Sequence, residues 1–162
     1  MAYEPHDARA VANLILAKAK QRGKSLTLMQ LIKLVYLCHG WSWAMLGRPM
    51  VKGSVQAWQY GPVYPEVYSA FKEFGSNPIS APARSRFSGA IYEEAFDNDE
   101  NELIEAVLDA YGDLHAFQLS NMMHRPGTPW TNAYNANGAY SDIDEREIRQ
   151  HYEALRDARA SS

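Results

Sequence analysis

The strongest constraint on how this chain folds is a helix that starts near residue 27 and is apolar around most of its circumference. Thr27 can cap its first turn, and Gln30, three residues later, can reach back to close a capping box. The apolar run continues to about Leu46, where Gly47 provides a stop. Because an apolar surface on nearly every side has to be covered, we expect this helix at the centre of the domain.

Two small residues one turn apart in this helix, Gly40 and Ala44, predict that another element approaches it closely. Further apolar stripes with helical spacing, bounded by capping residues, glycines and prolines, predict helices around it. We expect these helices at about residues 7–22, 65–75, 100–111, 116–124 and from 144 onward, with a short helical turn at 129–130.

A short β element is expected near the middle of the chain. Residues 53–60 alternate between polar and apolar side chains, as in a strand with one buried face. Gly61 and Pro62 should end this strand with a sharp turn, and Pro65 suits the first turn of the next helix. Residues 85–92 offer a second short strand. The fold class is therefore mainly α with a small β element, and 162 residues suit one domain spanning 1–162.

Charge is distributed unevenly along the chain, although the formal net charge is only −3. Residues 1–86 carry eleven Lys or Arg and four Asp or Glu, whereas residues 87–124 carry nine Asp or Glu and no Lys or Arg. Either the acidic segment folds back against the basic half, or one block is a docking surface that steers a partner of opposite charge. We favour the first interpretation because folded domains usually mix both signs over their surface.

Composition also bounds the compartment and the partners. No apolar run approaches the roughly 20 residues needed to cross a bilayer, and the first 20 residues lack the pattern of a secretory leader. The single cysteine cannot form an internal disulfide. These features predict a cytoplasmic protein without membrane contact. Nucleic-acid binding is not expected, because the basic residues are dispersed and no reading helix is recognisable.

The residues that could carry chemistry do not combine into a known site. Cys38 and His39 are adjacent, but helix neighbours point about 100° apart, so we expect a core cysteine and a buried histidine bonded to backbone or to a tyrosine. No histidines have the spacing of a helical metal site, and no phosphate-binding glycine loop is present. The carboxylates at 93–94 and 97–100 should form a solvated face. We therefore expect no catalytic residues, metal or cofactor. One alternative is an enzyme whose site is assembled from residues that are distant in the sequence.

Five stretches of the chain resemble one known family. These are L-T-L-M-Q-L-I-K-L-V-Y-L-C-H-G-W (residues 26–41), A-W-Q-Y-G-P-V-Y-P-E-V-Y (57–68), L-S-N-M-M-H (119–124), P-W (129–130) and I-D-E-R-E-I-R-Q-H-Y (143–152). Together they resemble the Panacea domain of the SocA-like antitoxins, a family that also includes the phage-associated GepA proteins. The resemblance covers roughly residues 10–155.

The resemblance implies an antitoxin that neutralises a cognate protein toxin by direct contact. The alternative that it implies is an adaptor that delivers the toxin to an ATP-dependent protease such as ClpXP. It implies nothing about oligomeric state. Ten positions match the family signature, and all except Lys33 are interpreted as structural: Lys33, Tyr36, Trp58, Gly61, Pro62, Val63, Pro65, Ser120, His124 and Trp130.

The toxin surface is expected around the turn that follows the predicted strand. Tyr60 and Tyr64 flank this turn, and aromatic and arginine side chains are the commonest anchors of protein interfaces. Arg48 and Lys33 are the cationic residues that we expect nearby. Tyr64 shares i, i+4, i+7 spacing with two other aromatic residues, so this helix face could equally be its core face.

Overall fold

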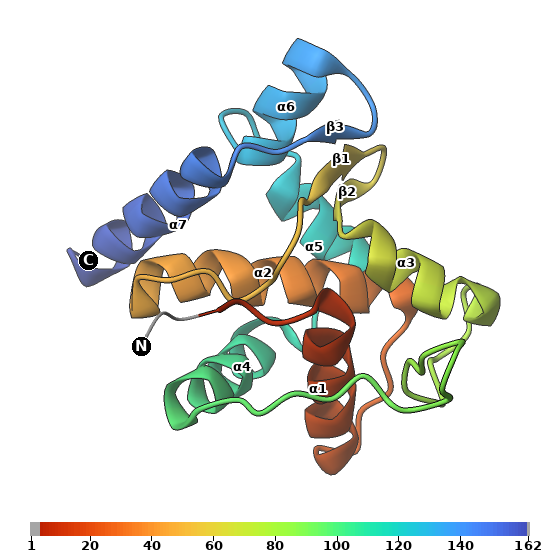
Figure 1. Cartoon of the computed structure of the whole chain (residues 1–162). Helices are drawn as coiled ribbons and strands as arrows, with labels where there is room; N and C mark the ends of the chain where they lie inside the picture. The colour runs from red at the N-terminus through yellow and green to blue at the C-terminus, as the bar shows by residue number, and fades with distance from the viewer. Residues whose placement is uncertain (1–3, 162) are drawn as a thin grey trace.

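Helix α2 (Leu28–Leu46) runs through the middle of the molecule, and the other elements pack around it (Figure 1). The structure is a computed structural model that describes residues 4–161. In chain order, the other elements of the described residues are α1 (Ala8–Gln21), β1 (Gln56–Trp58), β2 (Gly61–Val63), α3 (Pro65–Phe71), the 3₁₀ turn η1 (Lys72–Phe74), α4 (Asn98–Tyr111), α5 (Ala116–Met123), α6 (Pro129–Asn137), β3 (Ser141–Asp142) and α7 (Glu145–Ala160).

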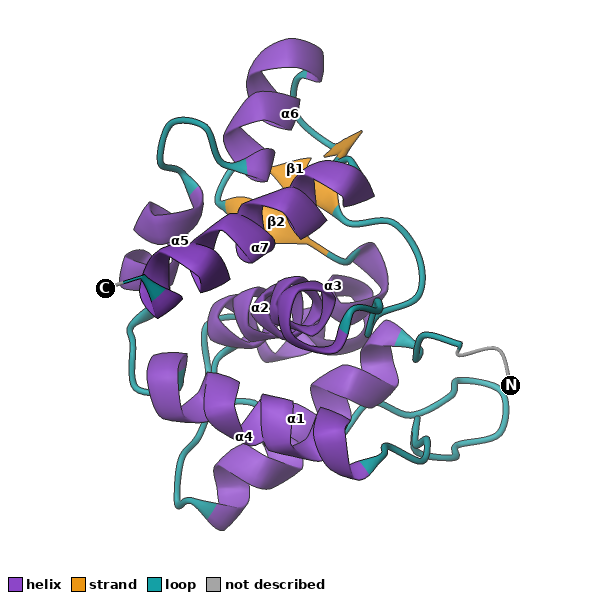
Figure 2. Cartoon of the chain, turned by 90° about the vertical axis from the view of Figure 1, so that its left-hand side faces the viewer, coloured by secondary structure: helices purple, strands orange, loops and turns teal. Residues whose placement is uncertain are grey.

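The central position of α2 confirms the sequence prediction. Thr27 accepts a hydrogen bond from the Gln30 backbone, the Gln30 side chain closes the capping box, and Gly47 ends the helix with a φ of 70°. Figure 2 shows α2 nearly end-on, with α1 and α4 on one side and α7 and the sheet on the other. Because partners surround it, even Lys33 and His39 are buried within α2.

Helix α7 approaches α2 as closely as the two small residues predicted. A Cβ atom built on Gly40 would overlap the ring of Tyr152 in α7. One turn further along α2, the Ala44 carbonyl accepts a hydrogen bond of 2.6 Å from Nη1 of Arg156. Glycine at position 40 therefore makes room for an aromatic ring in the contact between the two helices.

The β element differs from the predicted one. The strand expected over 53–60 is only three residues long, and Gly61 and Pro62 do not form the turn that ends it but begin the second strand, pairing with Trp58 and Ala57. A third strand, β3, was not predicted, and the strand order is β2-β1-β3. Over 85–92, the described structure forms a single bridge between Arg84 and Ile91 instead of a strand.

Two helices extend beyond their predicted bounds. Asp97 and Glu100 form a capping box, so α4 starts two residues before the expected position. Thr128 caps α6 and Pro129 occupies its first turn. Residues 129–137 thus form a nine-residue helix where only a turn was expected.

The acidic segment folds back against the basic half of the chain, as expected. Arg22, directly after α1, pairs with Asp109 at 2.7 Å and with Glu105 at 3.4 Å, both from α4. Lys24 pairs with Asp113 just after α4. Such exposed pairs contribute little energy individually, but they account for much of the charge asymmetry without a partner.

Part of the acidic segment is buried, which corrects the expectation of a uniformly solvated face. Glu100 is 2% exposed, and its Oε2 lies 2.8 Å from Nε2 of His6. Nδ1 of the same imidazole lies 2.8 Å from Oε1 of Glu94, and the ring stacks on Phe96. This histidine, which the sequence patterns did not single out, joins the start of the described chain to the start of α4.

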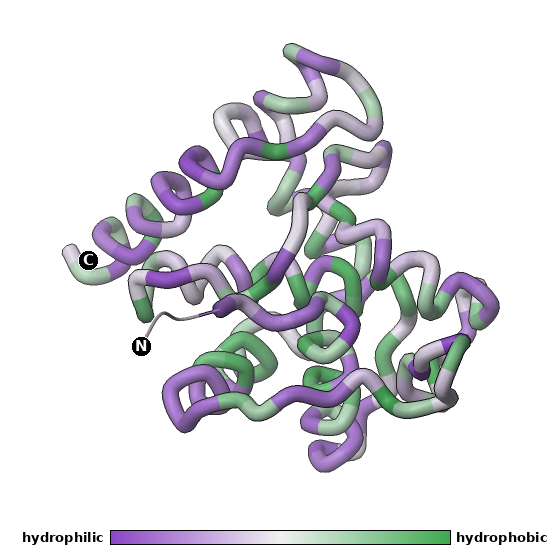
Figure 3. The backbone as a smooth tube through the Cα atoms, in the orientation of Figure 1, coloured by the Kyte–Doolittle hydropathy of each residue, from purple (hydrophilic) through white to green (hydrophobic). Residues whose placement is uncertain are grey.

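The hydropathy of the elements fits their positions. Helix α7 is mostly hydrophilic along its length (Figure 3), with Ile148 and Tyr152 buried on the side that meets the core. Among the described residues, no helix is both long enough and apolar enough to cross a membrane.

Candidate partner-binding surface

A tight β-hairpin places one of the predicted binding residues at the surface. Trp58 of β1 pairs with Gly61 of β2, which leaves Gln59 and Tyr60 as a two-residue turn. Gly61 has a φ of 129°, a conformation that favours glycine. Tyr60 is 60% exposed at the tip of this turn.

Two side chains from other elements fix the hairpin from below. Ser120 of α5 donates its hydroxyl to the Tyr60 carbonyl at 3.0 Å. Trp130 of α6 donates its indole N–H to the Trp58 carbonyl at 2.7 Å. Because both carbonyls belong to the turn region, the hairpin is held in one conformation before any partner binds, which lowers the entropic cost of association.

A buried cation lies beneath the same hairpin. Lys33 of α2 is 1% exposed, and burial lowers its pKa to about 8. Its Nζ donates a hydrogen bond of 3.4 Å to the Met29 carbonyl, and its Cε would lie 3.5 Å from a Cβ at Gly61. The Lys33 side chain does not extend to solvent, and it has no carboxylate partner among the described residues.

His124 completes this group of signature residues. Its ring lies against Trp130, with ring centroids 4.0 Å apart. Burial, followed by the charge on Lys33, lowers the pKa of His124. Because the lowered pKa disfavours the cation, the imidazole is neutral at neutral pH, and it packs as an aromatic side chain under the hairpin.

The neighbourhood of Ser120, His124 and Lys33 invites comparison with a nucleophile and its base. Ser120 Oγ lies 3.4 Å from His124 Nδ1, but the hydroxyl hydrogen already goes to the Tyr60 carbonyl. Nε2 of His124 is buried and has no hydrogen-bond partner among the described residues, so no third group orients the ring. An activated serine needs a hydroxyl that donates its hydrogen to the base and a third group that orients the base. The arrangement therefore supports the hairpin and does not form a catalytic dyad.

Aromatic side chains cover the outer side of the hairpin. The Trp58 ring makes edge contacts with Tyr68 of α3 and Tyr140 before β3, with centroids 5.0 and 5.4 Å apart. Tyr140 is 64% exposed and Tyr68 37%. We call this group of residues the aromatic surface: Trp58, Tyr60, Tyr68 and Tyr140.

Sequence reasoning missed Tyr140, although its backbone is unusual. Among the described residues it is the one non-glycine with a positive φ, 68°. Its N–H donates a hydrogen bond of 2.7 Å to the Ala57 carbonyl, which fixes this conformation next to the sheet. Strained backbone of this kind is commonest at functional sites. No local pattern marked the residue, because its position depends on the pairing of β1 with β3.

Two of the four predicted binding residues are buried and a third lies elsewhere. Tyr64, the N-cap of α3, is fully buried, and so is Phe71 at the end of that helix, whereas Tyr68 between them is exposed. Lys33 is under the hairpin and not on the surface. Arg48 follows the far end of α2 and pairs with Asp97 at 2.6 Å. About 13 helical residues, or roughly 20 Å, separate Lys33 from that end, so the structure does not bring Arg48 to Tyr60.

The remaining signature residues lie in secondary-structure elements. The Tyr36 ring packs edge-on against Tyr152, and Pro65 occupies the first turn of α3. Pro62 and Val63 are buried in β2. Eight of the ten signature positions thus gather at the hairpin and the side chains that support it: Lys33, Trp58, Gly61, Pro62, Val63, Ser120, His124 and Trp130.

The Cys38–His39 pair is structural. Burial raises the pKa of the Cys38 thiol well above its usual range, so no reactive thiolate is available. The Val51 N–H donates to Nδ1 of His39 at 3.1 Å, so Nε2 carries the hydrogen and donates to Glu145 at 2.8 Å. The backbone bond of a buried histidine is therefore confirmed. Within residues 4–161, no three His, Cys, Asp or Glu side chains lie close enough together to hold a metal ion.

Comparisons with known proteins agree with the sequence resemblance. The family described as antitoxin SocA-like, Panacea domain, matches residues 31–131, which is more than half of the chain. Antitoxin SocA of Caulobacter vibrioides (strain NA1000 / CB15N) is 40% identical over 136 residues, covering 82% of this chain and 72% of that protein. No solved structure matches the chain.

Proposed function

The chain belongs to the SocA-like antitoxin family with a Panacea domain, and we propose that it neutralises a cognate protein toxin by binding it directly. The observation that carries the direct-binding part is the aromatic surface. It presents exposed tyrosines on a hairpin that hydrogen bonds from two other helices hold in place.

The chemistry of the aromatic surface favours a protein as the partner. Tyrosine and tryptophan combine a large apolar area with a polar atom and lose little conformational entropy on binding. The surface lacks the cluster of cationic side chains that a nucleic acid would require. A cytoplasmic location fits Cys38, which is buried as a free thiol.

The experiment is co-expression with the product of the neighbouring open reading frame. We expect that product to arrest growth when expressed alone, and co-expression of this chain to restore growth. Affinity purification of this chain should then recover the toxin in a defined stoichiometry. A toxin that is neutralised in ClpXP-deficient cells but never co-purifies from them would contradict direct binding.

Sequestration and delivery to a protease share the binding step and differ in what happens to the toxin afterwards. The adaptor alternative predicts that toxin levels fall after synthesis stops, and that they fall only when both this chain and ClpXP are present. Sequestration predicts stable toxin in both strains. Time-resolved immunoblots of the toxin in wild-type and ClpXP-deficient cells distinguish the two.

A further inference from the structure

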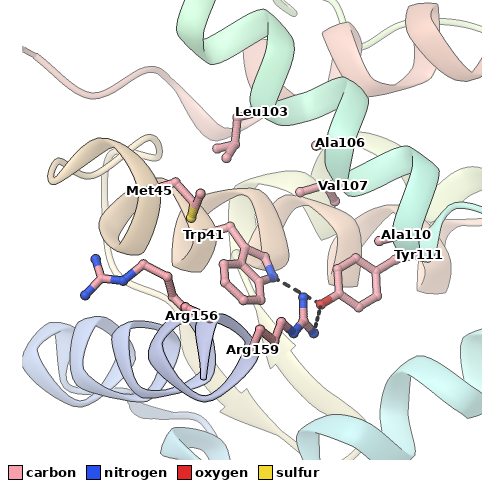
Figure 4. A pocket seen from close by; sticks show the side chains of 10 residues that line it. Trp41, Met45, Leu103, Ala106, Val107, Ala110, Tyr111, Arg156 and Arg159 are labelled. Atoms are coloured by element: carbon pink, nitrogen blue, oxygen red, sulfur yellow. Dashed lines mark hydrogen bonds between the residues drawn. The ribbon is translucent and has the colours of Figure 1, made fainter. Parts of the chain in front are cut away.

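A groove between α4 and α7 exposes apolar side chains that are not part of the aromatic surface (Figure 4). Its volume is about 460 Å³, and Trp41 and Met45 of α2 line it between the two helices. Met45 is 57% exposed. A flexible, polarisable methionine at an open apolar site is typical of binding surfaces.

The α7 side of the groove is cationic and held in a fixed geometry. The Arg159 guanidinium lies over the Trp41 ring at 4.7 Å and donates to the Tyr111 hydroxyl at 3.1 Å. The same hydroxyl accepts the Trp41 indole N–H at 3.1 Å. Arg156 donates to the Ala44 carbonyl at 2.6 Å. These contacts place two arginines along one side of an apolar cleft (Figure 4).

The α4 side of the groove is a smooth ridge with an acidic end. Ala106 and Ala110, one turn apart, are both exposed and line the groove beside Leu103. Side chains this small allow another helix to approach closely. Glu102 is exposed one turn before Ala106, so the ridge carries negative charge at the end away from Tyr111.

We propose that this groove binds helix α4 of a second copy of the chain, forming a dimer with two-fold symmetry. In such a dimer the same patch meets itself, and with the two-fold axis perpendicular to α4 at Ala106 the two α4 ridges run antiparallel. Glu102 of one copy, four residues before Ala106, then lies opposite Ala110 of the other, four residues after it. That is the end of the groove where Arg159 contacts Tyr111.

Charge complementarity within one surface is the reason for choosing a second copy as the occupant. The ridge supplies the carboxylate and the small residues, and the groove beside it supplies the arginines and the apolar floor. A two-fold contact requires both halves on the same patch, and here they adjoin along α4. The antiparallel arrangement brings opposite charges together at both ends.

Sedimentation equilibrium of the purified chain without toxin tests the proposal. We expect a concentration-dependent dimer, and we expect Ala106→Glu to abolish it because the substitution places two like charges at the axis. Ala106 is exposed, so folding is retained, and circular dichroism checks this. Because no toxin is present, the result is independent of the proposed antitoxin function.

Disulfide trapping locates the contact. Ala106→Cys should cross-link into a dimer on mild oxidation, because the two-fold axis brings position 106 next to itself. Ala154→Cys, an exposed alanine on α7 that does not line the groove, is the matched control, and the native Cys38 is buried. A chain that stays monomeric up to about 1 mM would overturn the proposal. So would a dimer that survives Ala106→Glu and cross-links equally at 106 and 154, which would place the contact elsewhere.

Discussion

Replacing Lys33 with methionine should stabilise this protein at neutral pH. Lys33 is buried without a carboxylate partner among the described residues, and burial lowers its pKa from 10.5 to about 8. Below the folded-state pKa the lysine is protonated in both the folded and the unfolded chain, so the folded state bears the full cost of the buried charge. A shift of this size corresponds to about 3 kcal/mol.

The cost should shrink as the pH rises between the two pKa values. In that window the folded chain releases the Lys33 proton while the unfolded chain still holds it, so wild-type stability rises with pH. The gain from Lys33→Met is therefore expected to fall from about 3 kcal/mol near pH 7 to about 1 kcal/mol near pH 10. Methionine has a similar length and fills the space without a charge.

Urea denaturation of both proteins at the two pH values is the measurement. Lys20→Met, at an exposed lysine of α1, is the matched control and should change stability by no more than about 0.5 kcal/mol at either pH. If Lys33→Met destabilised the protein at neutral pH, or if its effect did not vary with pH, the charge would have a compensating interaction, and this account of Lys33 would be wrong.

Three further predictions follow from the packing of α2. Cys38→Ala should cost about 1 kcal/mol of stability through lost packing and leave neutralisation intact; a folded variant that fails to neutralise would make the thiol functional. Gly40→Ala should lower stability by about 1–3 kcal/mol, because its Cβ overlaps the Tyr152 ring, and an unchanged melting temperature would contradict this close contact. Burial raises the pKa of Glu145, but hydrogen bonds that include one from His39 outweigh burial and hold the pKa below 4.5. The stability from this contact is thus present above pH 4.5 and lost as the pH falls further. Glu145→Gln should therefore lower the stability of the protein above pH 4.5 but not in acid, and a loss of stability that persisted in acid would contradict this.

The central helix could be predicted from sequence because its signals are local. A capping box, an apolar run and a glycine stop lie within 21 consecutive residues, from Thr27 to Gly47. The close approach at Gly40 was also readable, since only small residues permit it. What contacts Gly40 was not readable, because Tyr152 reaches it through the tertiary packing of α7.

The sheet and much of the partner-binding surface were harder to predict. Strands of two or three residues carry too little alternation to be recognised. The start of β2 was therefore interpreted as a turn, and β3 was missed. Helical spacing grouped Tyr64 with other aromatic residues but did not decide whether that face points inward or outward. Tyr140 joins the aromatic surface only because β1 pairs with β3, a contact between distant parts of the chain.

The most direct test of the proposed function is calorimetric titration of the purified toxin into Tyr60→Ala and Tyr140→Ala variants. Both residues are exposed, so each variant should melt like wild type yet bind at least about tenfold more weakly, a loss of 1 kcal/mol or more. Phe87→Ala, a fully exposed aromatic residue outside the aromatic surface, is the matched control and should bind normally. Wild-type affinity in both tyrosine variants would contradict the account and move the toxin contact away from the hairpin.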